Sequence, residues 1–172
     1  MKRVFAAAVL AASVSLAGCA TVMNGTNQPV EFQSDPSGAN VKLVSGLNCE
    51  APCTFEMKRG KDSQATFTMP GYEPVSVFIQ SRTGGGVAGN MLAGGIIGGI
   101  VDGSNGASNH LYPDPVYVRM VRLGSGGEAV LLDKKGAIIS TVAEYNARVG
   151  DDVRKGLQEQ GVMADETAVA AK

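Results

Sequence analysis

The chain has 172 residues, with 15 Lys and Arg against 16 Asp and Glu, 23 glycines and no tryptophan. A nearly neutral chain without a clustered basic face is not expected to bind nucleic acid, whose binders need such a face. The length suits one domain of ordinary size, and the composition allows it a modest core.

The first 18 residues have the features of a secretory signal peptide. Lys2 and Arg3 precede an uncharged, alanine-rich run over 4–16 that is too short to span a bilayer. Leu16-Ala17-Gly18-Cys19 resembles the bacterial lipobox, in which the cysteine thiol receives diacylglycerol; an ordinary signal peptide with a chance cysteine is the alternative. The resemblance implies lipidation of Cys19, and Ala20 in place of an aspartate implies the outer membrane. The protein is expected to face the periplasm, with the cell surface as the alternative.

Residues 19–28 are expected to form a short polar tether. Removal of the signal leaves 13 basic and 16 acidic side chains, a net charge near −3. Asn24-Gly25-Thr26-Asn27 predicts a turn before the first strand. If Pro29 begins the fold, the next module lies within a few tens of Å of the lipid surface, since an extended residue spans at most about 3.5 Å.

Residues 29–123 are predicted to form a β module. Apolar and polar residues alternate, as is typical of half-buried strands, in runs that begin at Val30 and recur at 40–44, 53–57, 64–69 and 75–80. Turns are predicted at 35–38 and 59–62. Pro70-Gly71 fits the central pair of a type II turn, where glycine tolerates the positive φ.

The motifs of residues 30–80 resemble those of the PEGA domain family, small β-sandwich modules of bacterial envelope and surface proteins. The resemblance rests on Pro36-Ser37-Gly38-Ala39, Ala51-Pro52-Cys53-Thr54, the basic turn and Pro70-Gly71-Tyr72-Glu73-Pro74. The chain departs from the family at Ser37, where the family has glutamate, and at 47–53, which replaces a glycine-containing turn. The resemblance implies a binding or scaffolding fold without catalytic residues.

Cys49 and Cys53 are expected to form a disulfide. They remain after Cys19 is acylated, and an exported chain meets an oxidising compartment. The loop that they close has five residues, so its chain-entropy contribution is small, roughly 2 kcal/mol. A pair of reduced thiols is the alternative. No metal site is expected, because His110 is the only histidine of the sequence.

Residues 84–106 form a glycine-rich apolar segment that is predicted to be helical. Gly95, Gly99 and Gly103 recur every four residues, so a helix would present bare backbone to a close neighbour. The uncharged run over 87–101 has 15 residues, fewer than the roughly 20 of a spanning helix. Two interpretations stay open: the segment packs on the β module or on another copy of the chain, or it dips into the membrane beside the anchor. If the segment enters the membrane or packs on another copy, these three glycines are expected to make the membrane or oligomer contact.

The chain is expected to return to the β module after this segment. Tyr112-Pro113-Asp114-Pro115 predicts a turn, and alternation over 116–121 predicts a strand that pairs with the earlier ones. The glycine-rich segment would then be an insertion between two strands of one sheet. His110, with no nucleophile pattern nearby, is interpreted as an exposed loop residue rather than a ligand or an acid–base group.

Residues 124–160 are predicted to form a hairpin and an amphipathic helix. Two apolar runs flank Asp133-Lys134-Lys135-Gly136, a hairpin signal. Ser140 or Thr141 can cap the helix, which Gly150 and Gly156 are expected to weaken. Its apolar stripe, expected to dock on the sheet or else to offer a partner surface, comprises Val142, Tyr145, Val149, Val153 and Leu157.

These predictions divide the chain into five parts. They are a signal peptide (1–18), a lipid-anchored tether (19–28), the β module with its insertion (29–123), the C-terminal hairpin and helix (124–160) and a flexible tail (161–172). The tail has too little apolar bulk to pack. The expected fold class is therefore mainly β, a small PEGA-like β-sandwich with a helical insertion.

The predicted function is non-catalytic binding or scaffolding at the outer membrane. The sequence has no Gly-x-Ser-x-Gly, His-Glu-x-x-His or phosphate-loop pattern, so neither enzymatic activity nor a cofactor is expected. The expected partners are the membrane, through the lipid anchor, a protein or peptidoglycan component of the envelope, and a second copy of the chain. The alternative is a membrane-inserting or self-oligomerising protein that uses residues 84–103.

Overall fold

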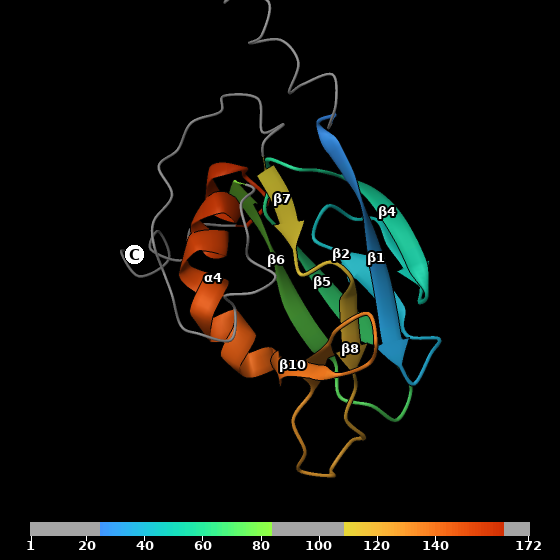
Figure 1. Cartoon of the computed structure of the whole chain (residues 1–172). Helices are drawn as coiled ribbons and strands as arrows, with labels where there is room; N and C mark the ends of the chain where they lie inside the picture. Colours follow the sequence, from blue (N-terminus) through green and yellow to red (C-terminus); the bar gives the residue numbers. More distant parts are fainter. Residues whose placement is uncertain (1–24, 84–108, 164–172) are drawn as a thin grey trace, which may run out of the picture.

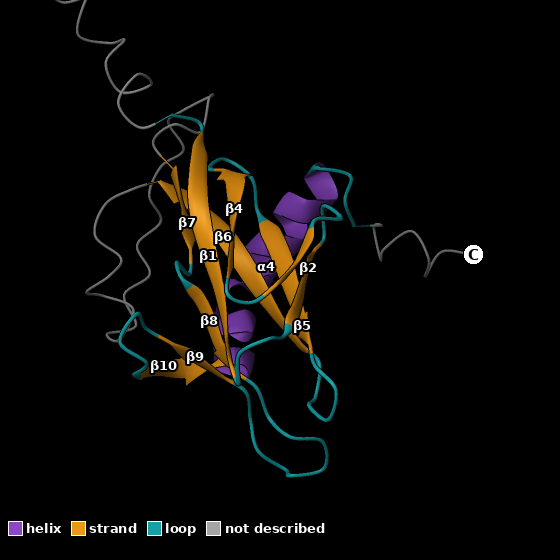
Figure 2. Ribbon diagram, turned by 90° about the vertical axis from the view of Figure 1, so that its right-hand side faces the viewer, coloured by secondary structure: helices purple, strands orange, loops and turns teal. Residues whose placement is uncertain are grey.

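The computed structural model describes residues 25–83 and 109–163, which form ten strands and one C-terminal helix (Figure 1). The strands belong to two five-stranded sheets, one of them curled into a half-barrel (Figure 2). The predicted mainly β class is confirmed, as is the C-terminal order of hairpin followed by helix.

The first sheet is built around the long strand β1. β4 runs antiparallel to its first part, and β8 runs parallel to its last four residues. Inward-facing side chains alternate along β1 with outward-facing ones, and each inward one is less than a tenth exposed: Gln28, Val30, Phe32 and Ser34. The sheet order is β10-β9-β8-β1-β4, with β1 (Asn27–Asp35), β4 (Cys53–Lys58), β8 (Val116–Arg119), β9 (Val130–Leu132) and β10 (Ile138–Thr141).

The second sheet confirms three of the predicted strands, β2, β5 and β6. Gly71 has a φ of +81° and the Tyr72 N–H donates to the Met69 carbonyl at 3.1 Å, as the predicted type II turn requires. The short β3 lies within 47–53, where no strand was predicted. The order is β3-β2-β5-β6-β7, with β2 (Asn40–Leu43), β3 (Asn48–Glu50), β5 (Ser63–Thr68), β6 (Val75–Thr83) and β7 (Asn109–Tyr112).

Segment 84–108 separates two neighbouring strands of the second sheet, β6 and β7. Thr83 pairs with Asn109, and Arg82 pairs with His110. An insertion within one sheet was therefore predicted correctly, but its second strand is β7, because β8 pairs with β1 in the first sheet. The interpretation of His110 as an exposed loop residue is wrong, since it is half-buried in β7. The helix predicted over 84–106 lies outside the described residues.

The C-terminal helix α4 (Val142–Glu159) is capped by Thr141. The Thr141 hydroxyl accepts from the Glu144 N–H at 3.1 Å, and a Glu144 carboxylate oxygen accepts from the Thr141 N–H at 3.2 Å, which completes a capping box. The predicted apolar stripe is confirmed as the buried face of the helix: Val142, Tyr145, Val149, Val153 and Leu157.

Helix α4 lies along an edge of β6 that no strand covers. β7 pairs only with the last four residues of β6, so the earlier part of that edge needs other partners for its backbone groups. Asn146 supplies them: its Oδ1 accepts from the Phe78 N–H at 3.1 Å, and its Nδ2 donates to the Ser76 carbonyl at 2.7 Å. The helix also contacts β10, so it connects the two sheets on this side.

The two sheets and the helix enclose one apolar core. Three phenylalanine rings meet in it: Phe32 lies 5.7 Å from Phe55 and 6.5 Å from Phe67, measured between ring centroids. Tyr145 extends the core to the helix, where its hydroxyl donates to the Tyr112 carbonyl at 3.0 Å. Burial raises the pKa of this phenol above its usual range.

Candidate functional site

Arg59, in the turn between β4 and β5, joins three segments at one end of the domain. Its Nε donates to the Asn27 carbonyl at 3.0 Å, and its Nη1 donates to the Asn109 carbonyl at 3.3 Å. Nη1 also lies 3.0 Å from Nδ1 of His110, which must be the acceptor because a guanidinium can only donate. We call this region the Arg59 end; it comprises residues 26–27, 58–62, 82–83 and 109–110.

Further polar contacts fix the Arg59 end. The Ser81 hydroxyl donates to the Arg59 carbonyl at 2.6 Å and accepts from Nδ2 of Asn109 at 2.8 Å. Asp62 Oδ1 accepts from the Ser81 N–H at 2.7 Å. The β4–β5 turn is thus held against both β6 and β7, and the points where the chain leaves at Thr83 and returns at Asn109 are fixed relative to the start of β1.

Asp62 is directed toward helix α4. Its carboxylate packs against the backbone of Gly156, where a Cβ would collide with it. Burial raises the pKa of Asp62 above its ordinary 3.8; the hydrogen bond from the Ser81 N–H opposes this, and the charges of Asp152 and Glu159 add to the rise. The Asp62 carboxylate therefore lies toward the helix, where Asp152 and Glu159 are also found.

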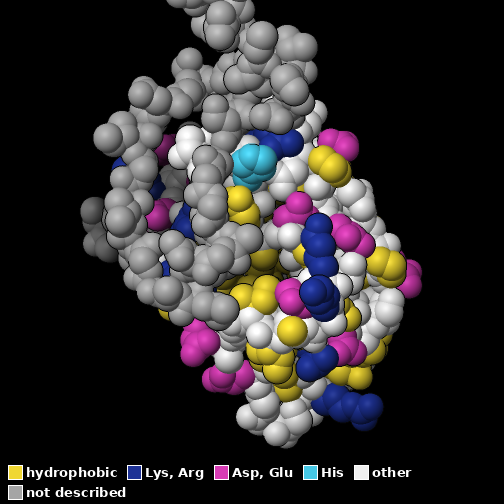
Figure 3. Space-filling model, viewed as in Figure 1, with side chains coloured by type: hydrophobic (Ala, Val, Ile, Leu, Met, Phe, Trp, Pro, Cys, Tyr) yellow, Lys and Arg dark blue, Asp and Glu magenta, His cyan; other side chains and the backbone are white. Residues whose placement is uncertain are grey.

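The described side chains near His110 do not form a nucleophile and base pair. The imidazole contacts a guanidinium, and the Ser81 hydroxyl donates to a backbone carbonyl instead. Figure 3 shows the histidine, in cyan, beside a Lys or Arg side chain. Within residues 25–83 and 109–163, no three His, Cys, Asp or Glu side chains are grouped so as to hold a metal ion. The Arg59 end is thus a structural clamp with exposed charge.

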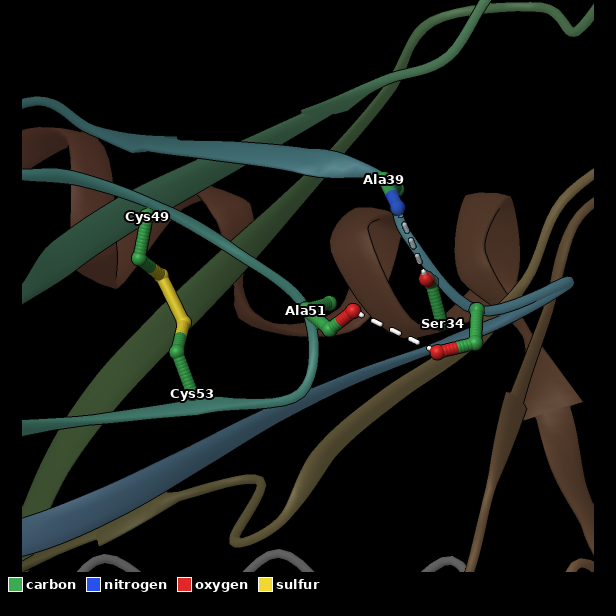
Figure 4. The surroundings of a disulfide bond; sticks show 6 residues. Ser34, Ala39, Cys49, Ala51 and Cys53 are labelled. Atoms are coloured by element: carbon green, nitrogen blue, oxygen red, sulfur yellow. Dashed lines mark hydrogen bonds between the residues drawn. A yellow bond between two sulfur atoms is a disulfide. The ribbon is translucent and has the colours of Figure 1, made fainter.

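Cys49 and Cys53 form a disulfide that joins the two sheets at one corner (Figure 4). Cys49 lies on β3, an edge strand of the second sheet, and Cys53 begins β4, an edge strand of the first. The predicted disulfide is confirmed. The disulfide also links the edge strands of the two sheets. This link could not be predicted from the short loop that the disulfide closes.

The Pro36–Ala39 turn packs on the same corner (Figure 4). The Ala39 N–H donates to the Ser34 hydroxyl at 3.2 Å, while the Ser37 hydroxyl and the Gly38 N–H donate to the Ala51 carbonyl at 3.4 and 2.9 Å. Gly38 has a φ of +97°, which favours glycine. The polar groups of this motif are therefore used within the fold, to hold the β1–β2 turn against the β3–β4 connection.

A shallow groove of about 300 Å³ lies between the first turns of α4 and the start of β6. Three valines line it, Val75, Val121 and Val142, together with the acidic residues Glu73 and Glu128. Its volume is at the lower limit of ligand pockets. The groove could accommodate a small apolar group with an adjoining positive charge.

The remaining predicted site residues lie outside the described part of the chain. These are the lipidation candidate Cys19 and the glycines predicted to contact a membrane or another copy, Gly95, Gly99 and Gly103. In the part of the chain that the structure describes, no helix is both long enough and apolar enough to cross a membrane.

Comparison with known proteins adds no relative. No family model, curated protein or solved structure matches the chain. The likeness to PEGA modules therefore stays a prediction from the motifs, and a function can be proposed only from the sequence and from the geometry of the described residues.

Gln28 is an important residue that sequence reasoning missed. Its Oε1 accepts from the Leu111 N–H at 3.0 Å, and its Nε2 donates to the Leu111 carbonyl at 3.3 Å and to Asp114 Oδ2 at 3.1 Å. The side chain of β1 thus replaces a strand neighbour for β7. A signal was present, since Gln28 precedes Val30 and Phe32 at the same period of two and so shares their buried face.

Proposed function

We propose that this protein is a lipid-anchored envelope protein that acts by non-catalytic binding or scaffolding at the periplasmic face of the outer membrane. The observation that carries the proposal is the position of Cys19, which follows an apolar leader and small residues and stands eight residues before Asn27, the start of β1. Several acyl chains on one cysteine anchor a domain far more firmly than one chain does.

A PEGA-like β-sandwich with a helical insertion is proposed for the β module. Two placements support it. The Pro36–Ala39 turn leads from β1 of the first sheet to β2 of the second, and the turn at Pro70 and Gly71 joins β5 to β6 within the second sheet. The motifs behind the resemblance thus occupy the connections that define the order of the strands.

Binding rather than catalysis is supported by how the polar groups are used. The hydroxyls of Ser34 and Ser37 bond within the fold, and His110 faces a guanidinium. Among the described residues, the valine-lined groove and the Arg59 end are the candidate surfaces for a partner. A protein or a peptidoglycan component of the envelope is the proposed partner class, since both present extended peptide and charged groups.

Metabolic labelling with a clickable fatty acid tests the anchor. We expect the wild-type chain to incorporate the label and to sediment with outer membranes, and the Cys19→Ala chain, exported by a cleavable signal, to do neither. A double variant, Cys49→Ser with Cys53→Ser, is the matched control, because it removes the other two thiols and is expected to keep the label. A wild-type chain without label would refute the anchor, and turnover of an envelope substrate by the purified protein would refute the non-catalytic role.

A second candidate is a membrane-inserting or self-oligomerising protein that uses residues 84–103. It is favoured by one observation: the segment leaves at Thr83 and returns at Asn109, both at the Arg59 end, beside the start of β1. The anchor and the apolar segment would then approach the membrane from the same side. The expected result is that the Cys19→Ala chain resists an alkaline carbonate wash, and that deletion of 84–103 makes it soluble and monomeric. Unchanged membrane retention and oligomeric state after the deletion would eliminate this candidate.

A further inference from the structure

Four cationic side chains gather at the Arg59 end without acidic partners. They are Lys58, Arg59, Lys61 and Arg82. Lys58 and Lys61 are exposed and the two arginines are half-buried. No ion pair of 4 Å or less among the described residues includes any of them, and the Arg59 guanidinium bonds to two backbone carbonyls and an imidazole. The Arg82 Nε donates to Gln80 Oε1, and Gln80 Nε2 in turn donates to Asp152 of α4, so Arg82 is directed toward the helix. The basic charge of the β4–β5 turn itself is that of Lys58, Arg59 and Lys61.

One acidic side chain, Glu56, is exposed on the same outer face of β4 as Lys58. The other acidic groups of this region face the helix. Asp62, the acid of the basic turn, points inward to the Ser81 N–H and the backbone of α4. Asp152 and Glu159 belong to the helix itself. Lys58 lies beside β1, as the direct cross-strand partner of Asn27, and the Lys61 N–H donates to the Lys58 carbonyl at 3.2 Å. This separation leaves a basic edge beside the start of β1.

The chain length between Cys19 and β1 limits how far this edge can lie from an anchored cysteine. Eight residues span at most about 28 Å when extended, and about 16 Å on average as a flexible chain. Since Lys58 pairs with Asn27, it lies where the tether enters the fold. The basic edge therefore stays close to the surface that holds the anchor.

We propose that the basic edge, formed by Lys58 and Lys61 with the half-buried Arg59 between them in the chain, binds the phosphate headgroups of acidic phospholipids. The proposal rests on the lipid anchor of the proposed function and adds an orientation: the Arg59 end faces the bilayer and the rest of the domain faces away. An acidic membrane surface attracts lysines that lie within about a Debye length, roughly 8 Å at physiological salt. Because the mature chain is acidic overall, such binding requires a local basic surface.

Vesicle sedimentation of the unlipidated chain, the mature protein with Cys19→Ala, tests the proposal. The vesicles contain phosphatidylcholine alone or equal parts of phosphatidylcholine and phosphatidylglycerol, at low ionic strength. We expect binding to the acidic vesicles, weakened about 25-fold by Lys58→Gln with Lys61→Gln, from a factor of about five for each lysine. The matched control is Lys134→Gln with Lys135→Gln, two exposed turn lysines in the β9–β10 hairpin, away from the start of β1 (Figure 2); it is expected to change binding less than twofold.

Each other outcome would overturn the proposal. No binding to acidic vesicles would show that the edge has no affinity for lipid. Equal binding to neutral vesicles would assign the contact to apolar residues, and equal losses in the two double variants would assign it to net charge. Fatty-acid labelling of the wild type separates the two proposals: label without charge-dependent vesicle binding refutes the orientation alone, and vesicle binding without label refutes the anchor alone.

Discussion

Replacement of Gln28 by leucine should destabilise the domain, although leucine is apolar and similar in size. Gln28 is 7% exposed and Leu111 is fully buried. The substitution removes the partners of both the N–H and the carbonyl of Leu111. These groups point away from β6. β7 is an edge strand of its sheet, so within residues 25–83 and 109–163 no strand replaces the lost contacts.

The expected loss follows from two opposing contributions. Each buried backbone group left without a partner costs about 2 kcal/mol, so the two together cost about 4 kcal/mol. Burial of the leucine side chain returns about 2 kcal/mol. The net loss in free energy of unfolding is therefore about 2 kcal/mol, which corresponds to a fall of roughly 6 °C in Tm for a domain of this size.

Urea denaturation of the unlipidated chain measures this loss, with Gln33→Leu as the matched control. Gln33 lies on the same strand, but its side chain is half-exposed and bonds to Glu31 at the surface, so a change within about 0.5 kcal/mol is expected. Hydrogen exchange should also become faster at the Leu111 amide. Equal stabilities of the two variants, with unchanged protection of that amide, would refute the role of Gln28 as a substitute strand.

Three further outcomes are expected in the unlipidated chain, each measured by denaturation. Gly156→Ala should destabilise by at least about 1 kcal/mol despite alanine's higher helix propensity, because the new methyl group meets the short Asp62 side chain. In the control, Gly150→Ala, the methyl group meets only the movable end of an arginine. Equal losses in the two variants would contradict the packing of Asp62 on Gly156. Because burial raises the pKa of Asp62, ionisation of this carboxyl lowers the stability of the wild type as the pH rises above 3.8. Asp62→Asn, which still accepts from the Ser81 N–H, should therefore become more stable relative to the wild type between pH 4 and pH 7. A stability difference that does not change with pH would contradict the raised pKa. Tyr145→Phe removes one buried hydrogen bond and should cost about 1 kcal/mol, so an unchanged midpoint would contradict that bond.

Most of the strands were predictable from the sequence, but β3 and β7 were not. In β1, β2 and β5, alternation records burial directly, because one face of each strand meets the core. β7 has one fully buried side chain, Leu111, and is held by Gln28 and by Arg59. These are contacts with distant segments, and a pattern within four residues cannot record them.

The clamp at the Arg59 end was beyond prediction for a related reason. The sequence indicates a polar, basic turn at 59–62, but the partners of Arg59 lie 32, 50 and 51 residues away. Gly156 is similar: the sequence suggests a weak point in the helix, whereas the structure gives the glycine a function, since Asp62 occupies the space of a side chain. The disulfide needed no such long-range information, because its two cysteines are four residues apart.

The adjacent positions of Thr83 and Asn109 have a consequence for how the protein can vary. A chain that leaves and re-enters a sheet through one pair of facing residues can lengthen, shorten or change in composition without moving the strands on either side. Doubling the 25 residues of segment 84–108 would cost only about 0.6 kcal/mol in closure entropy. The domain is thus an adaptable platform, in which selection can remodel one long segment while the disulfide, the core and the helix stay under separate constraint.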